Sequence, residues 1–348
     1  MKYFICIFLL VIITLNSCSD NTNSFVNENE KIKIAALIDL SGHYSQFGIE
    51  SKQSMELALL ETKKIDVTFY DTKADENIAN SILDSLINKN KPDVVVTLAS
   101  WISNNLSQKL KNNNILQMAI GSAVYNYANL NNCIRFTGDV AKETEFLSNY
   151  LKKYNKIAVL YFNNDYGIGW ENSLKSILGT KLIKSISYSD TNKDFTNQLL
   201  EIKNLNPDAL VLISTREAVE IVKQAANINL KVDMYGVRPT LTNQLLKEPN
   251  ADGLMFSYPD LDKSKPIFNS FKSKYGYRMS SFGAEAYDLI KSLDQLYQSN
   301  KKNDVLFTNY KNKTYNGAIS KIKFDENGQA ECEFTICIIK NGTWEELK

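Results

Sequence analysis

Few residues in this chain could carry out catalysis. His43 is the only histidine, which nearly excludes the multi-histidine sites that hold catalytic zinc. Ser41 and Ser45 lie beside it, but the sequence has no GxSxG turn that would expose a nucleophilic serine. Gly167-Ile168-Gly169 begins like a dinucleotide-binding loop, yet residues 170–172 supply no third glycine, and no GxxxxGKS/T phosphate loop occurs. The sequence therefore predicts a protein that is not an enzyme and uses no metal or cofactor.

The start of the chain carries an apolar segment that ends at a cysteine. Residues 4–15 have the length of a signal-peptide core and are too short to span a bilayer, which takes about 20 residues. Leu15-Asn16-Ser17-Cys18 resembles the bacterial lipobox, whose cysteine is lipidated and then becomes the first residue. We expect residues 1–17 to be a lipoprotein signal peptide, Cys18 to anchor the protein to the bacterial cell envelope, and the polar residues 18–30 to form a tether. An ordinary secretory leader is the alternative.

The remaining cysteines and the charges exclude further classes of function. Cys332 and Cys337 are about 16 Å apart in an extended strand, too far for a disulfide, so we interpret them and Cys133 as buried thiols. Lys and Arg number 40 against 39 Asp and Glu, which leaves no basic face for nucleic acid. Arginine is rare beside lysine, so each one is a candidate for a planar contact with two donors; the four are Arg135, Arg216, Arg238 and Arg278.

Two successive series of apolar segments and helical patterns run through the body of the chain. The apolar segments are continuous rather than alternating, which is typical of parallel strands covered on both faces. The first series has strands at 32–40, 67–70, 93–98 and 115–120 and helices at 48–62, 78–87 and 104–111. The second has strands at 156–162, 182–188, 209–214, 233–237 and 253–258 and helices at 167–178, 195–205, 216–227 and 242–247. A helix at 281–299 and an antiparallel pair at 314–324 and 331–340 follow.

These patterns predict an α/β protein with two doubly wound parallel-sheet lobes. Ligands of such sheets bind beyond the carboxyl ends of the strands. The loops at that edge, which we expect to face each other across a cleft, are residues 41–47, 99–103, 121–124, 163–167, 214–216 and 237–239.

Six segments, in order, resemble the branched-chain amino acid binding proteins, which are extracytoplasmic receptors of ABC importers with the type I periplasmic binding fold. They are residues 32–48 (IKIAALIDLSGHYSQFG), 133–139 (CIRFTGD), 156–169 (KIAVLYFNNDYGIG), 193–200 (KDFTNQLL), 252–259 (DGLMFSYP) and 314–328 (TYNGAISKIKFDENG). The resemblance implies two discontinuous lobes joined by three hinge crossings, residues 31–138 with 258–317 and residues 139–257 with 318–348. It also implies a monomer that closes on a small-molecule ligand and delivers it to ABC permease subunits. A ligand-sensing or scaffold lipoprotein on the same fold is the alternative.

The resemblance also assigns candidate ligand contacts. Phe47 would cover the ligand and Ser100 would bond its carboxylate, beside the segment Gly121-Ser122-Ala123. Tyr166 and Thr215 would contact it from the second lobe, and Trp101 lies where it could stack on the ligand. Packing inside the loops is the alternative for the three aromatic residues, and capping of the following helix is the alternative for Ser100.

The turn Gly236-Val237-Arg238-Pro239 departs from the family, which has an acid there that pairs with the ligand's ammonium group. A guanidinium at this position would repel an ammonium group in a partly desolvated cleft. We therefore expect Arg238 to face the cleft and to bind a small organic acid, an amide or a similar polar group. The alternative is an ion pair of Arg238, at the surface or between the lobes.

Overall fold

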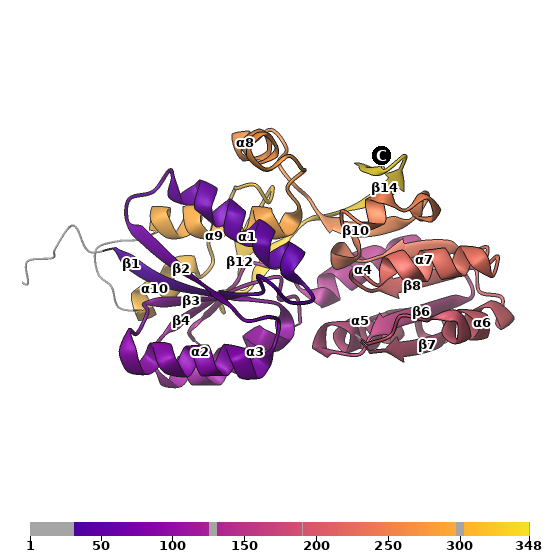
Figure 1. Cartoon of the computed structure of the whole chain (residues 1–348), viewed down its shortest axis with the longest axis horizontal. Coiled ribbons are helices and arrows are strands. Elements are labelled where there is room, and N and C mark those ends of the chain that lie inside the picture. The colour runs from indigo at the N-terminus through magenta and orange to yellow at the C-terminus, as the bar shows by residue number, and fades with distance from the viewer. Residues whose placement is uncertain (1–30, 125–130, 190, 297–302, 348) are drawn as a thin grey trace, which may run out of the picture.

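The computed structural model describes residues 31–124, 131–189, 191–296 and 303–347. The predicted signal peptide, Cys18 and the whole of the predicted tether lie outside the described residues. The described chain forms two α/β bodies side by side, each built on its own sheet (Figure 1).

Lobe 1 is built on a parallel five-stranded sheet with the strand order β2-β1-β3-β4-β5. We use this name for the sheet together with α1–α3 and α8–α10. The strands are β1 Ile32–Ile38, β2 Ile65–Asp71, β3 Val94–Leu98, β4 Leu116–Ile120 and β5 Cys133–Arg135. The helices are α1 Ser45–Leu59, α2 Glu76–Lys89, α3 Ser100–Asn112, α8 Pro266–Tyr275, α9 Ser281–Leu296 and α10 Asn303–Tyr310.

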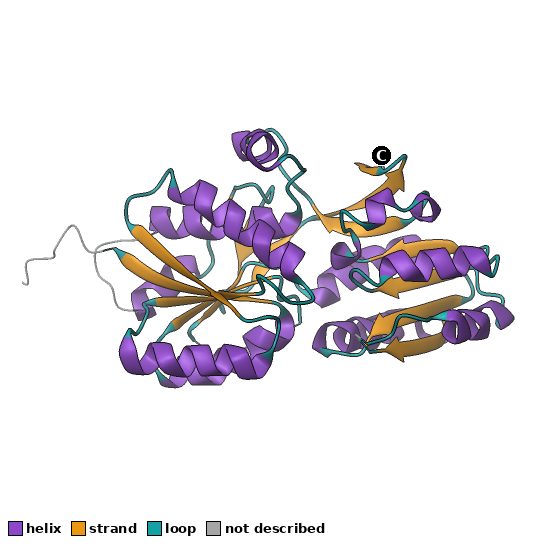
Figure 2. Cartoon of the chain, viewed as in Figure 1, coloured by secondary structure: helices purple, strands orange, loops and turns teal. Residues whose placement is uncertain are grey.

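Both faces of this sheet are buried, which explains the continuous apolar strands. On β1, Ala35 and Leu37 pack in the cluster with α2 and α3, whereas Ala36 and Ile38 pack in the cluster that includes α1 and α9. Successive side chains of a strand point to opposite faces, so each face receives every second residue. Figure 2 shows helices above and below the strands of this lobe.

Lobe 2 is built on a seven-stranded sheet with the strand order β15-β14-β10-β9-β8-β6-β7. Five strands are parallel: β6 Ile157–Phe162, β7 Leu182–Tyr188, β8 Ala209–Ile213, β9 Asp233–Gly236 and β10 Met255–Pro259. β14 Phe334–Lys340 and β15 Thr343–Glu346 add an antiparallel edge. The helices are α4 Val140–Leu151, α5 Asp165–Leu178, α6 Thr196–Asn204 and α7 Ala218–Asn227. The predicted fold class, two doubly wound lobes, is confirmed.

A third, small sheet lies where the sequence predicted one antiparallel pair. β11 Thr314–Tyr315, β12 Ile322–Phe324 and β13 Ala330–Cys332 pair with each other, while β14 leaves them and pairs with β10. The Phe324 ring packs against Phe136 and Tyr310, at centroid distances of 5.1 and 5.2 Å. We therefore propose that lobe 1 continues to Cys332, so that the third crossing lies at Glu333 rather than at residue 317.

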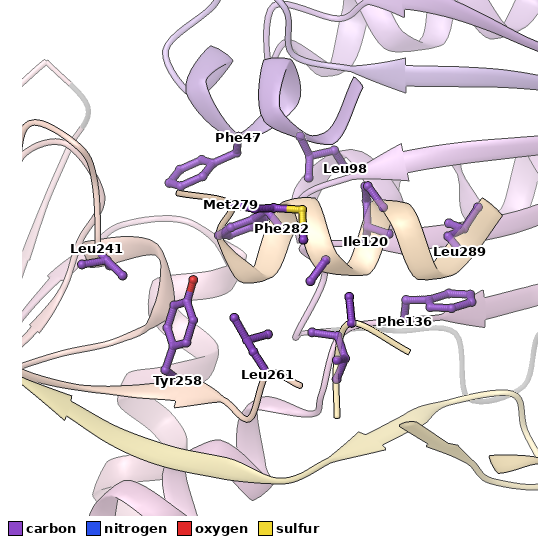
Figure 3. Close-up of a cluster of buried hydrophobic side chains, with 14 of the residues drawn as sticks. Phe47, Leu98, Ile120, Phe136, Leu241, Tyr258, Leu261, Met279, Phe282 and Leu289 are labelled. Atoms are coloured by element: carbon purple, nitrogen blue, oxygen red, sulfur yellow. The ribbon is translucent and has the colours of Figure 1, made fainter. Parts of the chain in front are cut away.

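Helix α9 packs in the core of lobe 1, and its first residue contacts β10 of lobe 2. Figure 3 shows Phe282 and Leu289 of α9 among Leu98, Ile120 and Phe136, with Tyr258 of β10 on the other side. The Ser281 N–H donates to the Tyr258 hydroxyl at 2.7 Å, within the buried cluster. The two lobes therefore meet at the start of α9.

Candidate ligand-binding site

A cavity lies between the two lobes at the carboxyl ends of their strands. Its volume is about 640 Å³, including the part that is open to solvent. Each of the six loops that the sequence selected contributes to its lining. Lobe 1 supplies Asp39, Tyr44, Phe47, Thr72, Ala74, Leu98, Ala99, Ser100, Trp101, Ile102, Gly121 and Phe282, and lobe 2 supplies Phe162, Asn164, Tyr166, Ile213, Ser214, Thr215 and Pro239.

Aromatic rings dominate this lining. Phe47 and Phe282 pack against each other with their ring centroids 4.4 Å apart. Trp101 is held by a bond from its Nε1 to the Ala74 carbonyl at 3.2 Å, and its ring lies 5.0 Å from that of Tyr44. The walls therefore suit a flat or bulky apolar group.

Asp39 is the only ionisable acid among the described residues that line the cavity, and no lysine or arginine is among them. Its two carboxylate oxygens accept bonds from the Gly42 and Tyr44 N–H groups at 2.6 and 2.7 Å. The charge of Asp39 is thus used to shape the loop that carries Tyr44 and Phe47. A carboxylate has further lone pairs, so Asp39 remains the one acidic group among the described lining residues.

Two hydroxyl groups in the lining, which lie near Tyr188 and Trp170, make no well-formed hydrogen bond to the described residues. The Ser214 and Tyr166 hydroxyls are buried, and within the described part of the chain neither has a partner that meets hydrogen-bond geometry. Buried polar groups are normally paired, so an unpaired one in a cavity wall favours a bond to a ligand. Thr215 differs, because its hydroxyl already donates to Glu217 Oε2 at 2.7 Å.

The backbone is strained where α3 begins. Ala99, which lines the cavity, has φ 78° and ψ 148°, a conformation that residues with a Cβ rarely adopt. Ser100 is the first residue of α3 and not its N-cap, and its hydroxyl accepts a bond from the Val124 N–H at 3.3 Å. The capping role considered for Ser100 is therefore not the one in the structure.

The structure brings six of the nine candidate contacts together around the cavity: Phe47, Ser100, Trp101, Gly121, Tyr166 and Thr215. Ser122 and Ala123 are buried behind the wall and do not line it. The Ser122 N–H donates to the Thr137 hydroxyl at 3.0 Å, and the Ala123 carbonyl accepts from Arg135 at 2.9 Å.

Arg238 does not line the cavity either. Its guanidinium is 3% exposed and donates to the Glu285 carboxylate, so the ion pair between the lobes is the alternative that the structure supports. Although burial opposes the charge, Glu285 and then Glu143 hold the pKa of Arg238 above its ordinary value. The expected contact between Arg238 and a ligand therefore has no support in this arrangement.

At the rim of the cleft, a second set of contacts joins the lobes. His43 Nε2 lies 2.5 Å from Glu217 Oε1, and the Arg216 guanidinium contacts the other ring nitrogen of His43. Burial works against the charge of Glu217, but the bonds from His43 and Thr215 hold the pKa of its carboxyl below the ordinary value. Nearby, the Asn104 amide donates to Asp165 at 3.1 Å.

Sequence reasoning missed several of these residues. Tyr44 and Ser214 lie in loops that it selected but were not chosen, and Phe282 lies at the start of a predicted helix, outside the selected loops. Glu285 could have been singled out from the sequence, because an acidic residue among the apolar residues of a buried helix needs a charged or hydrogen-bonding partner. Among the described residues, no helix is long and apolar enough to cross a membrane, and no cluster of His, Cys, Asp and Glu could hold a metal ion.

Two doubly wound lobes with a cavity between their strand ends define the class of two-lobed binding receptors. The profile of the periplasmic binding protein family matches residues 31–343, and the chain belongs to this family. The predicted membership is confirmed, and the family implies a binding receptor located outside the cytoplasm.

Solved structures agree with this fold. An extracellular ligand binding receptor from Desulfohalobium retbaense DSM5692 is 29% identical, with a TM-score of 0.87, over 91% of this chain and 60% of that chain. LivJ, the branched-chain amino acid transporter substrate binding protein from Streptococcus pneumoniae str. Canada MDR_19A, was solved in complex with isoleucine; it is 19% identical, with a TM-score of 0.84, over 91% of this chain and 99% of that chain. A solute binding protein of an ABC transporter from R. palustris, solved in complex with benzoate, is 18% identical, with a TM-score of 0.83. The match covers 91% of this chain and 95% of that chain. No curated protein matches the sequence.

Proposed function

We propose that this protein is a lipid-anchored receptor of an ABC importer, which closes its lobes around a small carboxylate and delivers it to the permease. The observation that carries this proposal is the cavity between the strand ends of two lobes, lined by residues of both. A ligand that contacts both lobes stabilises the closed form over the open one, as transport receptors require. The anchor at Cys18 would keep the receptor beside its permease.

The lining favours a ligand with an aromatic or flat apolar body and no ammonium group. Rings from both lobes, among them Tyr44 and Phe162 with centroids 6.2 Å apart, would pack on such a body. Asp39, the one carboxylate among the described lining residues, already accepts a backbone bond on each oxygen, so an ammonium group would have to share it with these two N–H donors. The Ser214 and Tyr166 hydroxyls, which make no well-formed bond to the described residues, would bond the polar end of the ligand.

The ligands of the structural neighbours support a carboxylate. Isoleucine and benzoate both carry one, although they differ in the rest of the molecule. Of the two, benzoate fits the reasoning above, because it is flat and has no ammonium group. We infer that aromatic monocarboxylates are the ligand class and that branched-chain amino acids are poor ligands.

A thermal-shift panel with benzoate, benzamide and isoleucine tests this function. A compound at 100 times its Kd stabilises the native state by about 2.7 kcal/mol, so benzoate is expected to raise Tm by several degrees and isoleucine by less than one. Native mass spectrometry of the purified protein would show a retained acid directly.

A pair of serine variants makes the panel specific to the cavity. Ser214→Ala should weaken benzoate binding about tenfold, because the ligand loses a buried hydrogen bond. Ser148→Ala is the matched control, since the Ser148 hydroxyl is also buried without a partner but lies on α4, outside the cavity lining. Tight isoleucine binding, or equal loss of benzoate binding in both variants, would contradict the proposed ligand class.

A further inference from the structure

Arg238 and Glu285 form a buried ion pair between the lobes. Arg238 follows β9 of lobe 2, and Glu285 lies in the first half of α9 of lobe 1. Their side chains are 3% and 2% exposed, and the Arg238 Nη1 group donates to Glu285 Oε1. Because both groups are buried, each charge has lost its hydration, and the loss is compensated only while the two groups are paired.

Each member of the pair has other partners on its own side. Glu285 Oε2 accepts bonds from the Gly121 N–H at 3.0 Å and the Thr137 hydroxyl at 2.9 Å, both at the end of the lobe 1 sheet. Arg238 lies close to Glu143 of α4, whose pKa burial raises to about 7 in spite of a bond from Ser257 and the charge of Arg238. Separation of the lobes would thus break the bond between Arg238 and Glu285 and leave the other contacts in place.

The pair also supports the wall of the cavity. Gly121 and Phe282 both line it. Glu285 fixes Gly121 through the backbone bond described above, and the Arg238 guanidinium lies over the Phe282 ring with its Cζ 4.2 Å from the ring centroid. The same two side chains that join the lobes therefore fix two surfaces that a ligand would contact.

We propose that Arg238 and Glu285 form a closure pair, which holds the lobes together at the base of the cleft and sets the position of Gly121 and Phe282. The proposal rests on the receptor function inferred above, and it makes both groups positioning residues rather than ligand contacts. In an open form each charge regains water, whereas in the closed form each depends on the other. Removal of one charge therefore penalises the closed form alone, and removal of both relieves the penalty.

Small-angle X-ray scattering of the unliganded protein tests this. We expect Arg238→Met and Glu285→Gln each to raise the radius of gyration, with a fall of at least about 30-fold in the ratio of closed to open molecules. The double variant Arg238→Met/Glu285→Gln should return to within about tenfold of the wild-type ratio. Asn104→Ala is the control, because it removes an exposed contact between the lobes, and exposed polar contacts contribute little.

An equal radius of gyration in the wild type and both single variants would overturn the proposal, as would a double variant that is as open as the single ones. A pair that served only the stability of the fold would lower Tm without any change of radius. If a single variant does not fold, Arg238→Gln takes its place, because it removes the charge but keeps a polar side chain that can donate to Glu285; an unchanged radius there overturns the proposal too. The scattering needs no ligand, so its result is independent of the benzoate panel.

Discussion

Glu50 is a carboxyl group buried inside lobe 1. It lies on α1 and is 6% exposed, and one of its oxygens, Oε1, accepts bonds from the Ser280 N–H, the Ser280 hydroxyl and the Gly283 N–H. Burial raises the pKa of Glu50 to about 7, and these bonds only partly offset it. The ordinary value is 4.5, so in the folded protein Glu50 holds its proton at pH values where the unfolded chain has lost it.

This difference makes stability fall with pH. Between about pH 4.5 and 7 the folded state holds a proton that the unfolded chain has lost, so the free energy of unfolding decreases as pH rises. Above pH 7 it is roughly 3 kcal/mol lower than it is below pH 4.5. Glu50→Gln keeps the accepting oxygen and removes the titration. Relative to the wild type, we expect this variant to gain roughly 3 kcal/mol between pH 5 and pH 8 in urea unfolding.

Other buried carboxyls do not disturb that comparison. Glu143 and Asp288 also have a pKa raised to about 7 by burial, but they are present in both proteins and cancel in the difference. Glu56→Gln, at an exposed position of the same helix, should show the wild-type pH dependence. If Glu50→Gln did so as well, Glu50 would not be the buried proton carrier.

At the level of single residues, the sequence predicted contacts that lie in loops at the strand ends and failed for those that depend on distant partners. Phe47, Ser100 and Tyr166, which the family resemblance assigned, line the cavity because their loops lie at the carboxyl ends of the strands. Arg238 was expected in the cavity because nothing near it in sequence reveals Glu285, 47 positions away. Pairing over such distances is a property of the folded chain.

Among the elements, the start of α3 has a strained backbone conformation at Ala99. β3 ends at Leu98 and α3 begins at Ser100, so a single residue, Ala99, makes the turn at φ 78°. This short connection puts residues 98–102 into the wall of the cavity. The strain lies beside the candidate ligand site, and strained residues often cluster at such sites.

Ala99→Gly relieves this strain and should raise the free energy of unfolding by about 1 kcal/mol. The gain is the cost of an alanine in a conformation natural to glycine, about 1–3 kcal/mol, less the entropy that glycine loses on folding. Urea unfolding at one pH measures it. Ala226→Gly, at an exposed position of α7, is the control and should lower stability by up to about 1 kcal/mol; a loss at both positions would contradict the strain at Ala99.

The buried strands were the most predictable elements. β3 and β4 were placed to within one residue, because a continuous apolar run bounded by polar residues fixes both ends. Helices α4, α8 and α10 were missed, and the pairing of residues 334–340 was wrong, whereas residues 331 and 332 do pair with the predicted partner strand. An apolar run predicts a strand without naming its neighbour, and β14 pairs with β10, a strand about 80 residues earlier in the chain.

For the molecule as a whole, the predicted anchor at Cys18 would decide where the protein works. We expect Cys18→Ala to shift the protein from the membrane fraction to the soluble fraction, because a multiply acylated cysteine holds a protein at a bilayer and an unmodified chain does not. Immunoblots of fractionated cells measure it. Cys6→Ala, within the predicted signal peptide, should leave the distribution unchanged, and a Cys18→Ala protein that stays with the membranes would refute the anchor.

The late position of α9 in the chain has a consequence for how the protein is made. Phe282 and Leu289 cover the same face of the lobe 1 sheet as Met55 of α1, so that face stays exposed until residues 281–296 have been synthesised and exported. The β6–β9 core of lobe 2 and its four helices, in contrast, occupy one continuous stretch, residues 140–236. As the chain emerges, the β6–β9 core of the second lobe can therefore fold while the first lobe still waits for α9, although the edge strands β14 and β15 of the second lobe come last of all.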